Sequence, residues 1–487
     1  MTVTPKHPPH AWQADELAAH GAEDAWGVLW EPGLGKTKLA VDTYAELEDG
    51  SEVEGLFVIA PPGVHYNWVR KELPAHLPDE LADRSEILLW DTNKSKNKGF
   101  QERAQEILKH EGPAILSMSY HSLMTDRGQK YAKKFLQKRR CLQVLDESHW
   151  IKSPGANRTI RATASGKYAP YRRILTGTLV ADSPFDVFTQ LRYLRPDIWH
   201  AIGCRTAEAF KATFGVWSKG YARDKEYPVL VTYRNLELLH EIVDSIGSRL
   251  TAEGAGLVLP EKVYPKVYFD MTPEQLRAYD ELRREFTTYL AGAHVDAPLA
   301  ITRLLRLQQV TSGFLPTEDP EKDDVVMTPF PGPNPRIECL REVVRERDDR
   351  QGIIWAKYRW DLTLIERMLR EEGITYARYD GETKDPEGEL ERFWGGEAQL
   401  FISNPAKGGE GITLNEAKWA VFYNNSHKLL HRKQAEKRND RIGQDVAELE
   451  LIDLMARHSV DGLIVETLRK KNQWAAVVHG DEIRDWI

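Results

Sequence analysis

Short apolar runs alternate with amphipathic stretches over the first 180 residues of the chain. The runs AWGVLW (25–30), GLFVIAPP (55–62), GPAILSMSY (112–120), CLQVLDESH (141–149) and YRRILTGT (171–178) predict buried strands. Between the first two, TKLAVDTYAELE (37–48) has helical spacing. Strands that alternate with helices in this way indicate a parallel sheet with crossover helices. Each strand stops at a polar or glycine-rich cluster, where open α/β sheets bind ligands.

The pattern changes between residues 181 and 335. Apolar residues recur at three- and four-residue spacing, which predicts helices in 184–194, 236–247, 273–292 and 301–315. The proline-rich and charged stretch 317–336 is interpreted as a loop. Strand-like runs then return in GIIWAK (352–357), GITYARYDG (373–381), AQLFISN (398–404), KWAVFYNN (418–425) and ELELIDLM (448–455).

This order of elements predicts an α/β fold with two nucleotide-binding-type lobes and a helical insertion between their sheets. We place lobe 1 at residues 1–258, with a helical protrusion at about 181–250, and lobe 2 at 259–487, with a helical protrusion at about 270–335. A chain of 487 residues is too long for a single hydrophobic core, which favours several domains.

Composition excludes some classes of protein. An apolar content of 41% and a charged content of 29% are ordinary for a soluble protein. No apolar run approaches the roughly 20 residues that span a bilayer, and the N-terminus is not typical of a secretion signal. Cys141, Cys204 and Cys339 lie far apart, without metal-ligand spacing. We therefore expect a cytoplasmic protein without membrane partners. A net charge of −8 means that binding to nucleic acid depends on local basic clusters.

The segment WEPGLGKT (30–37) carries the first chemical signal, because it stands between a predicted strand and a predicted helix. Glycines there let backbone N–H groups surround a polyphosphate, and the helix N-terminus adds positive partial charge. We expect Gly33, Leu34 and Gly35 to form the loop, Lys36 to reach the terminal phosphates of ATP, and Thr37 to bind Mg²⁺. The alternative is an ordinary glycine-rich turn before a helix.

Two adjacent carboxylates, Asp146 and Glu147, end the predicted strand at 141–146. In an ATPase, Asp146 would hold Mg²⁺ and Glu147 would polarise the water that attacks the γ-phosphate. A solvated loop is the alternative, and it is less attractive because the pair follows a phosphate loop on a separate strand.

The segment QAEKRNDRIGQ (434–444) places Gln434, Arg438 and Arg441 at offsets of four and seven, which share one face of a helix. Such a face is normally solvent-exposed. Phosphoryl transfer, however, needs positive charge at the γ-phosphate in the transition state, and arginine is suited to supply it. We therefore predict catalytic roles for these three residues together with Glu147.

Together these motifs resemble those of superfamily 2 helicases, in particular their SWI/SNF-like branch of double-stranded DNA translocases. GLGKT and DESH are similar to motifs I and II, although the branch more often has alanine or glycine where Ser148 stands. LTGT (175–178), NPAKGGEGITL (404–414) and the Arg-Ile-Gly-Gln ending of 434–444 resemble motifs III, V and VI. Gln13 matches the adenine-reading glutamine of the family, and the resemblance extends from there to about residue 472.

The resemblance implies two RecA-like lobes that close on one ATP, with helical protrusions between motifs III and IV. It implies that Gly411 also contacts the nucleotide. It further implies DNA contacts that recognise phosphate without reading sequence. The candidates are Pro61, Ser119, Tyr120, Thr176, Thr178, Lys357, Ser403 and Lys407. Two basic clusters either extend this track or are solvated faces: Lys94, Lys96 and Lys98, and Lys133, Lys134, Lys138, Arg139 and Arg140.

The function implied is an ATP-dependent DNA translocase that moves along duplex or branched DNA in remodelling, reannealing or fork processing. A strand-separating DNA or RNA helicase and a motor that displaces proteins from DNA are the alternatives. A non-enzymatic scaffold would predict damage at Lys36, Glu147 or Arg441, and all three are intact. The size of the chain suggests a bacterial or phage-borne motor, and nothing in the sequence argues for stable oligomerisation.

Overall fold

The apolar runs of the first lobe become one parallel sheet. Every residue of GLFVIA is buried, as expected for a strand with helices on both of its faces. The computed structural model describes residues 4–222, 225–291, 297–319, 324–347, 350–408, 412–441, 443–444 and 446–481. Within these residues the first sheet has the order β3-β4-β2-β5-β6-β1-β9, with every pairing parallel. Its strands are β1 (Ala25–Trp30), β2 (Gly55–Ala60), β3 (Glu86–Leu89), β4 (Ala114–Ser119), β5 (Cys141–Asp146), β6 (Tyr171–Leu175) and β9 (Gly247–Leu250).

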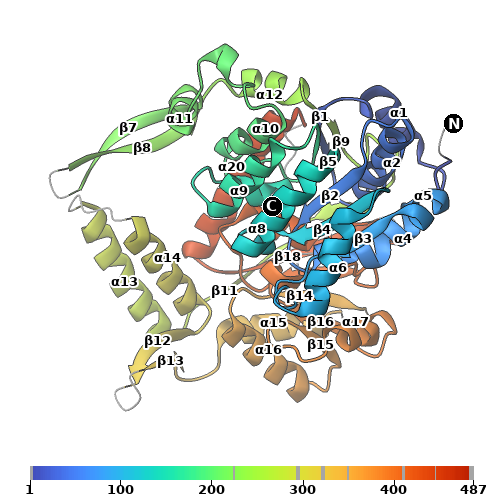
Figure 1. The fold of residues 1–487 in the computed structure, drawn as a ribbon. Helices are drawn as coiled ribbons and strands as arrows, with labels where there is room; N and C mark the ends of the chain where they lie inside the picture. The colour runs from blue at the N-terminus through green and yellow to red at the C-terminus, as the bar shows by residue number, and fades with distance from the viewer. Residues whose placement is uncertain are drawn as a thin grey trace. The chain divides into compact units, whose positions relative to one another are not determined.

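Helices connect these strands in the crossover pattern that the sequence predicts (Figure 1). The longer ones are α1 (Ala11–His20), α2 (Lys36–Asp49), α6 (Lys98–Lys109), α8 (Asp126–Lys138), α9 (Asn157–Gly166), α10 (Val187–Leu194), α11 (Ala207–Phe214) and α12 (Leu236–Asp244). The shorter ones are α3 (Val64–Asn67), a π-helical turn (Trp68–Glu72), α4 (Leu73–His76), α5 (Asp79–Arg84), α7 (Tyr120–Leu123) and 3-10 turns at Ser148–Ile151, Pro184–Asp186 and His200–Ile202.

The segment 181–250 is not purely helical. It contains a two-stranded hairpin, β7 (Gly215–Ala222) and β8 (Lys225–Tyr233), and its last strand, β9, joins the main sheet beside β1. The helical periodicity of 236–247 hid β9, which is only four residues long and carries a single apolar side chain. Its place in the sheet comes from backbone pairing with β1, which a hydrophobic pattern does not report.

The second sheet is also parallel. Within the described residues it has the order β10-β18-β17-β14-β16-β15, and β11 also pairs with β18. The first residues of β18 pair with β10 and its last residues with β11. The strands are β10 (Glu261–Val263), β11 (Lys266–Phe269), β14 (Gly352–Trp355), β15 (Tyr376–Tyr379), β16 (Leu400–Ser403), β17 (Trp419–Phe422) and β18 (Glu448–Ala456).

Two long helices, α13 (Pro273–Ala291) and α14 (Ala297–Thr311), follow β11 as the periodicity predicts. The interpretation of 317–336 as a loop is wrong, because β12 (Phe314–Asp319) and β13 (Asp324–Pro329) form an antiparallel hairpin. Prolines in this stretch concealed the strands. An isolated pair of strands has two open edges, where a missing N–H is tolerated. The remaining helices are α15 (Pro335–Arg345), α16 (Arg359–Glu371), α17 (Pro386–Trp394), α18 (Pro405–Gly408), α19 (Leu429–Glu436) and α20 (Val460–His479).

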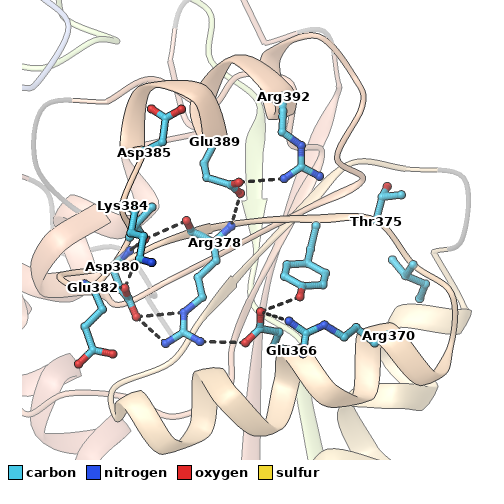
Figure 2. Close-up of a pocket in the computed structure, with 13 residues that line it drawn as sticks. Glu366, Arg370, Thr375, Arg378, Asp380, Glu382, Lys384, Asp385, Glu389 and Arg392 are labelled. Atoms are coloured by element: carbon cyan, nitrogen blue, oxygen red, sulfur yellow. Dashed lines mark hydrogen bonds and ion pairs between the residues drawn. The ribbon is translucent and has the colours of Figure 1, made fainter.

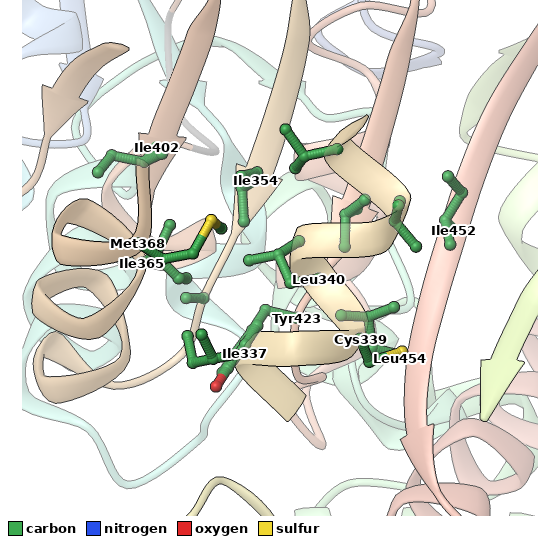
Figure 3. Close-up of a cluster of buried hydrophobic side chains, with 14 of the residues drawn as sticks. Ile337, Cys339, Leu340, Ile354, Ile365, Met368, Ile402, Tyr423, Ile452 and Leu454 are labelled. Carbon is green, nitrogen blue, oxygen red and sulfur yellow. The ribbon is translucent and has the colours of Figure 1, made fainter. Parts of the chain in front are cut away.

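A continuous apolar core covers one face of the second sheet (Figure 3). Ile354, Ile402 and Ile452 project from three of its strands towards Leu340 of α15 and Ile365 of α16. All five side chains are fully buried. This packing fixes the strand ends on which the candidate residues of this lobe lie.

The chain divides into two units. Unit 1 comprises Met1–Gly215, Tyr233–Leu257 and Trp474–Glu482, and unit 2 comprises Val216–Thr232, Val258–Gln473 and Ile483–Ile487. Unit 1 contains the first sheet and unit 2 the second. Among the helices of the described residues, none combines the length and the apolar character needed to cross a membrane.

Candidate nucleotide site and catalytic residues

The glycine loop joins β1 to α2 as predicted. Gly33 and Gly35 have φ values of +91° and +78°, a left-handed conformation that glycine adopts without the penalty of a side chain. Leu34 between them is buried. The loop therefore ends at the N-terminus of a 14-residue helix, the arrangement that favours a bound phosphate.

The Lys36 ammonium folds back onto its own loop. Its Nζ donates to the carbonyl oxygens of Trp30 at 2.9 Å and Glu31 at 3.1 Å. Burial lowers the pKa of Lys36, and the carboxylates of Glu147 and Asp146 act in the opposite direction. The loop and the acidic pair therefore belong to one electrostatic site. Thr37 is half-buried on the first turn of α2.

Gln13 lies against the same loop, from helix α1. Its Nε2 donates to the Gly35 carbonyl at 3.0 Å, and its Oε1 accepts from the backbone N–H of His10 at 2.9 Å. The neighbouring Trp12 indole donates to the Leu34 carbonyl at 3.2 Å. The structure therefore shows Gln13 as a brace for the loop, while its reading of adenine stays a prediction.

Asp146 and Glu147 stand at the carboxyl end of β5. The Asp146 Oδ2 accepts from the Trp68 indole at 2.8 Å, and its Oδ1 accepts from the Glu147 backbone at 2.9 Å. Burial, with the adjacent Glu147 charge as the next cause, raises the pKa of Asp146 to about 6. Glu147 has φ +50°, an uncommon conformation for a residue with a side chain. Its Oε2 lies 3.2 Å from His149 Nδ1.

Thr37 and Asp146 offer the oxygen ligands that Mg²⁺ prefers. Each carboxylate oxygen of Asp146 accepts one hydrogen bond and retains a free lone pair for a metal. No cluster of three or more His, Cys, Asp or Glu side chains suited to a metal exists in the described part of the chain. Because Mg²⁺ is commonly held by one or two protein ligands plus substrate phosphates, this donor set fits the ion.

Gln190, which none of the sequence motifs includes, connects Ser148, the residue after the acidic pair, to the loop after β6. Its Oε1 accepts from Ser148 Oγ at 2.7 Å, and its Nε2 donates to the Leu179 carbonyl at 2.8 Å. The signal was present in the sequence, since a glutamine at an inward position of the apolar helix 184–194 needs buried partners.

The predicted motif III residues Thr176 and Thr178 are buried on that loop. The Thr176 backbone donates to the Val28 carbonyl at 3.1 Å, and a Cβ at Gly177 would lie 2.8 Å from Pro32 Cδ. The phosphate loop, the acidic pair and motif III are thus one packed assembly at the carboxyl edge of the first sheet.

In unit 2, the prediction that Gln434, Arg438 and Arg441 share one face of a helix is wrong. Helix α19 ends at Glu436, so Gln434 lies on it, whereas Arg438 and Arg441 lie in the turns that follow. Each arginine reaches back through Nε, Arg438 to the Gln434 carbonyl at 2.8 Å and Arg441 to the Lys437 carbonyl at 2.9 Å.

Both arginines also bind the motif V segment. Arg438 Nη1 donates to the Ile412 carbonyl at 2.8 Å, and Arg441 Nη1 donates to Thr413 Oγ1 at 2.7 Å. Desolvation lowers the pKa of Arg441. The structure thus brings motifs V and VI together. The predicted nucleotide contact Gly411 lies outside the described residues.

Several predicted DNA contacts have buried side chains. Tyr120 is fully buried, and its hydroxyl donates to the Asp146 carbonyl at 2.9 Å. Ser119 is buried and caps α7 by accepting from the Ser122 backbone at 3.0 Å. Ser403 is fully buried and donates to the Tyr379 carbonyl. The surface role predicted for these three side chains gains no support from their positions.

The other predicted contacts differ in accessibility. Pro61 is buried directly after β2. Lys357 is half-buried, donates from Nζ to Gln308 Oε1 at 2.6 Å, and has its pKa lowered by burial to about 8. Lys407 is exposed, with its ammonium 5.8 Å from the Tyr379 ring centre. Lys407 is therefore the member of the set most accessible to a large ligand.

Both predicted basic clusters contribute to one cleft in unit 1, through Lys98 of the first and Lys134 of the second. The cleft has a volume of about 600 Å³ and lies between α6 and α8. Five cations and two carboxylates line it: Lys98, Lys109, Arg127, Lys130 and Lys134, with Glu102 and Glu106. Among the described residues, Lys109, Arg127, Lys130 and Lys134 have no acidic partner within 4.0 Å. Arg139 of the same prediction is instead buried and donates to the Ile107 carbonyl at 2.6 Å.

A further pocket in unit 2, of about 700 Å³, contains none of the predicted site residues (Figure 2). Arg378 lies at its centre and pairs with Asp380 at 2.8 Å and Glu366 at 2.9 Å. Glu389 in turn pairs with Arg392 at 2.9 Å. The charged groups at its centre are therefore paired with one another.

Two parallel sheets, a phosphate loop beside an acidic pair, and a paired motif V and VI define an enzyme of the ATP-dependent helicase class. Comparison with known families agrees. The family model "SNF2-related domain" matches residues 27–311, more than half of the chain, and "Helicase conserved C-terminal domain" matches residues 335–443. The chain belongs to the SNF2-related family.

Among curated relatives, the chain is similar to the mouse "DNA annealing helicase and endonuclease ZRANB3", with 23% identity over 91% of this chain and 38% of that protein. It is also similar to the Drosophila melanogaster "ATP-dependent helicase brm", with 23% identity over 91% and 27%. The zebrafish "Chromodomain-helicase-DNA-binding protein 1-like" shows 22% identity over 89% and 40%. The chain therefore spans two fifths or less of the length of these relatives.

Among solved structures, the fold is similar to the "Sulfolobus solfataricus SWI2/SNF2 ATPase core in complex with dsDNA". The match includes 99% of this chain and 95% of the chain in that structure. Its sequence identity is 18% and its TM-score is 0.43.

Proposed function

We propose that this chain is an ATP-dependent DNA translocase of SWI/SNF-like type, which hydrolyses ATP to move along duplex or branched DNA. The observation that carries the proposal is the assembly in unit 1, where the phosphate loop, Asp146–Glu147 and the Thr176–Thr178 loop contact one another at one edge of a parallel sheet. Ligands bind at this edge in open α/β sheets.

In this proposal the residues of unit 1 perform the chemistry. Lys36 leaves the carbonyls of Trp30 and Glu31 and binds the terminal phosphates of ATP. Thr37 and Asp146 would hold Mg²⁺, which when bound would neutralise charge on the phosphate oxygens. Glu147 accepts a hydrogen bond from the attacking water and orients it in line with the γ-phosphorus.

Arg438 and Arg441 of unit 2 would supply positive charge to the transition state, with Gln434 beside them. An arginine in this role is worth about 10³ to 10⁵ in kcat. Two points remain predictions from the sequence. The first is that both arginines reach the phosphates. The second is that residues 1–258 and 259–487 act as the ATP-binding and C-terminal lobes.

DNA as the track is supported by the names of the curated relatives, which include a DNA annealing helicase and a chromodomain-helicase-DNA-binding protein. The cationic cleft between α6 and α8 adds local support in a chain whose net charge is −8. Cations without acidic partners favour a polyanion, because no internal ion pair must be broken to bind it.

The proposal is tested by measuring ATP hydrolysis with duplex, forked and single-stranded DNA and with RNA, alongside a strand-displacement assay. We expect duplex DNA to stimulate hydrolysis most, without separation of the strands. Strand separation would favour the helicase alternative, and a strong preference for RNA would contradict the proposal. Lys130→Glu should weaken stimulation by DNA and leave hydrolysis without DNA unchanged.

A further inference from the structure

Asp440, the residue before Arg441, is a buried anion held by two lysines. Its side chain is about 1% exposed, and its Oδ2 lies 3.1 Å from Lys262 Nζ and 2.9 Å from Lys437 Nζ. Burial by itself would raise the pKa of Asp440, but the charges of Lys262 and Lys437 outweigh it and lower the pKa. Asp440 is therefore ionised, and it depends on both lysines for its charge balance.

Lys262 differs from Lys437 because it comes from a distant part of the chain. It is the middle residue of β10, the first strand of the long segment of unit 2 that begins at Val258. Residues 261–263 pair with β18, which fixes the backbone of Lys262 in the sheet. The pair with Asp440 thus joins a rigid strand to the turn that carries the candidate catalytic arginine.

The same stretch of chain contacts motif VI at a second point. The Tyr264 hydroxyl donates to Glu436 Oε2 at 3.4 Å, and Glu436 is the last residue of α19. Tyr264 therefore contacts the first residue of the segment 436–440, and Lys262, two residues earlier in the chain, contacts the last. This segment contains Arg438 and leads directly into Arg441.

The turn at residues 437–441 needs such contacts because it lies beyond the end of helix α19. The last helical i to i−4 hydrogen bond is donated by the Lys437 N–H to Lys433, and the Arg438 N–H donates to Ala435 in a tighter turn. The α-helix therefore ends before Arg438 and does not orient Arg441. An arginine that acts in a transition state must be held close to its productive position, since a displacement of about 1 Å can lower the rate by about a hundredfold.

We propose that Lys262 is a positioning residue for ATP hydrolysis, which holds the turn of Arg441 in its active position through Asp440. The inference rests on the proposed function, in which Arg441 acts on the transition state.

The test compares six variants of the full chain by steady-state ATP hydrolysis and by binding of a fluorescent non-hydrolysable ATP analogue; Asp440→Asn and the double variant Lys262→Met/Asp440→Asn complete the set. Lys262→Met removes the charge and keeps the length of the side chain, and Lys262→Arg keeps the charge. Lys266→Met is the matched control, since Lys266 is exposed on the adjacent strand β11. Arg441→Ala establishes the contribution of the arginine itself.

For Lys262→Met we expect kcat and kcat/KM to fall together by roughly tenfold to a hundredfold, the loss typical of a misplaced catalytic group. Binding of the analogue should be retained, and Lys262→Arg should restore most of the rate. Lys266→Met should match the wild type. The double variant Lys262→Met/Asp440→Asn should be no slower than Asp440→Asn alone, because both changes break one contact.

Wild-type turnover in Lys262→Met, or additive losses in the double variant, would overturn the inference. If Lys262→Met fails to bind the analogue, the turnover of Asp440→Asn is measured in its place. Normal turnover in Asp440→Asn also overturns the inference. An unchanged rate in Arg441→Ala is a different result, because it removes the arginine from the proposed mechanism. The failure of the inference and the failure of the proposed function are therefore distinguishable.

Discussion

Replacing Gly35 by alanine tests the contact between α1 and the phosphate loop. Gly35 has φ +78°, and a Cβ placed there would lie 2.2 Å from Nε2 of Gln13. Gln13 is flexible at its tip, so it can move away, but it then loses its hydrogen bonds to the Gly35 carbonyl and from the His10 N–H. Gly33 provides a matched control, since its φ is +91° and nothing lies within 4 Å of its added Cβ.

The two substitutions share one cost and differ in another. A left-handed conformation costs an L-residue about 1–2 kcal/mol, which applies to both positions. Loss of two hydrogen bonds adds roughly 1–3 kcal/mol at Gly35 alone. In thermal unfolding, 1 kcal/mol corresponds to about 2–4 °C for a domain of 150–250 residues. Gly35→Ala should therefore lower the unfolding temperature of unit 1 by several degrees more than Gly33→Ala does.

The assay follows the thermal unfolding of unit 1 by hydrogen exchange of its own peptides, in a double-mutant cycle with Gln13→Ala. In the Gln13→Ala background the excess cost of Gly35→Ala should vanish, because the hydrogen bonds are already absent. Equal shifts for Gly33→Ala and Gly35→Ala, or an excess that persists without Gln13, would refute the reasoning.

Three further predictions concern the two units separately. Glu147→Gln should bind ATP but not hydrolyse it, as a filter-binding assay combined with phosphate release would show; appreciable hydrolysis would remove Glu147 from its assigned role. Since burial and then the Glu147 charge raise the pKa of Asp146 to about 6, Mg²⁺-dependent nucleotide binding should be half-maximal near pH 6, increase as pH rises and Asp146 ionises, and decline as pH falls and Asp146 is protonated. In Glu147→Gln this midpoint should move to lower pH, and an unmoved midpoint would exclude the coupling. In unit 2, Arg336 is fully buried, pairs with Asp461 and donates from Nε to the Thr311 carbonyl at 3.1 Å. Arg336→Met should therefore destabilise the unit by about 3–5 kcal/mol in denaturant unfolding, whereas Arg345→Met, at an exposed pair, should change little.

The elements whose position depends on side-chain pattern were predictable from the sequence. Short continuous apolar runs such as GLFVIA favour strands covered on both faces, and each of the five runs of the first lobe is a strand of its sheet. The phosphate loop was equally predictable, because Gly33 and Gly35 are required where the backbone turns left-handed.

Elements held by backbone pairing were not predictable in this way. The hairpin of β12 and β13 contains prolines and charges, and β9 has four residues, so neither carries a hydrophobic period. The periodicity at motif VI also predicted a helix that continues to Arg441, although α19 ends at Glu436. Spacing of four and seven is compatible with a helix face, but the chain leaves the helix at Glu436, where Tyr264 and Lys262 hold the turn instead.

The sequence alone determined the chemistry that we propose for this protein, because phosphate binding and water activation require particular residue types at short spacing. Lys36, Thr37, Asp146 and Glu147 could be assigned to these roles from two local motifs. Tertiary structure decided which groups brace those motifs: Gln13 on the phosphate loop, Gln190 between the acidic pair and motif III, and Lys262 on Asp440. Such contacts join residues far apart in the chain, and a buried polar side chain reveals its need for a partner but not which partner the fold supplies.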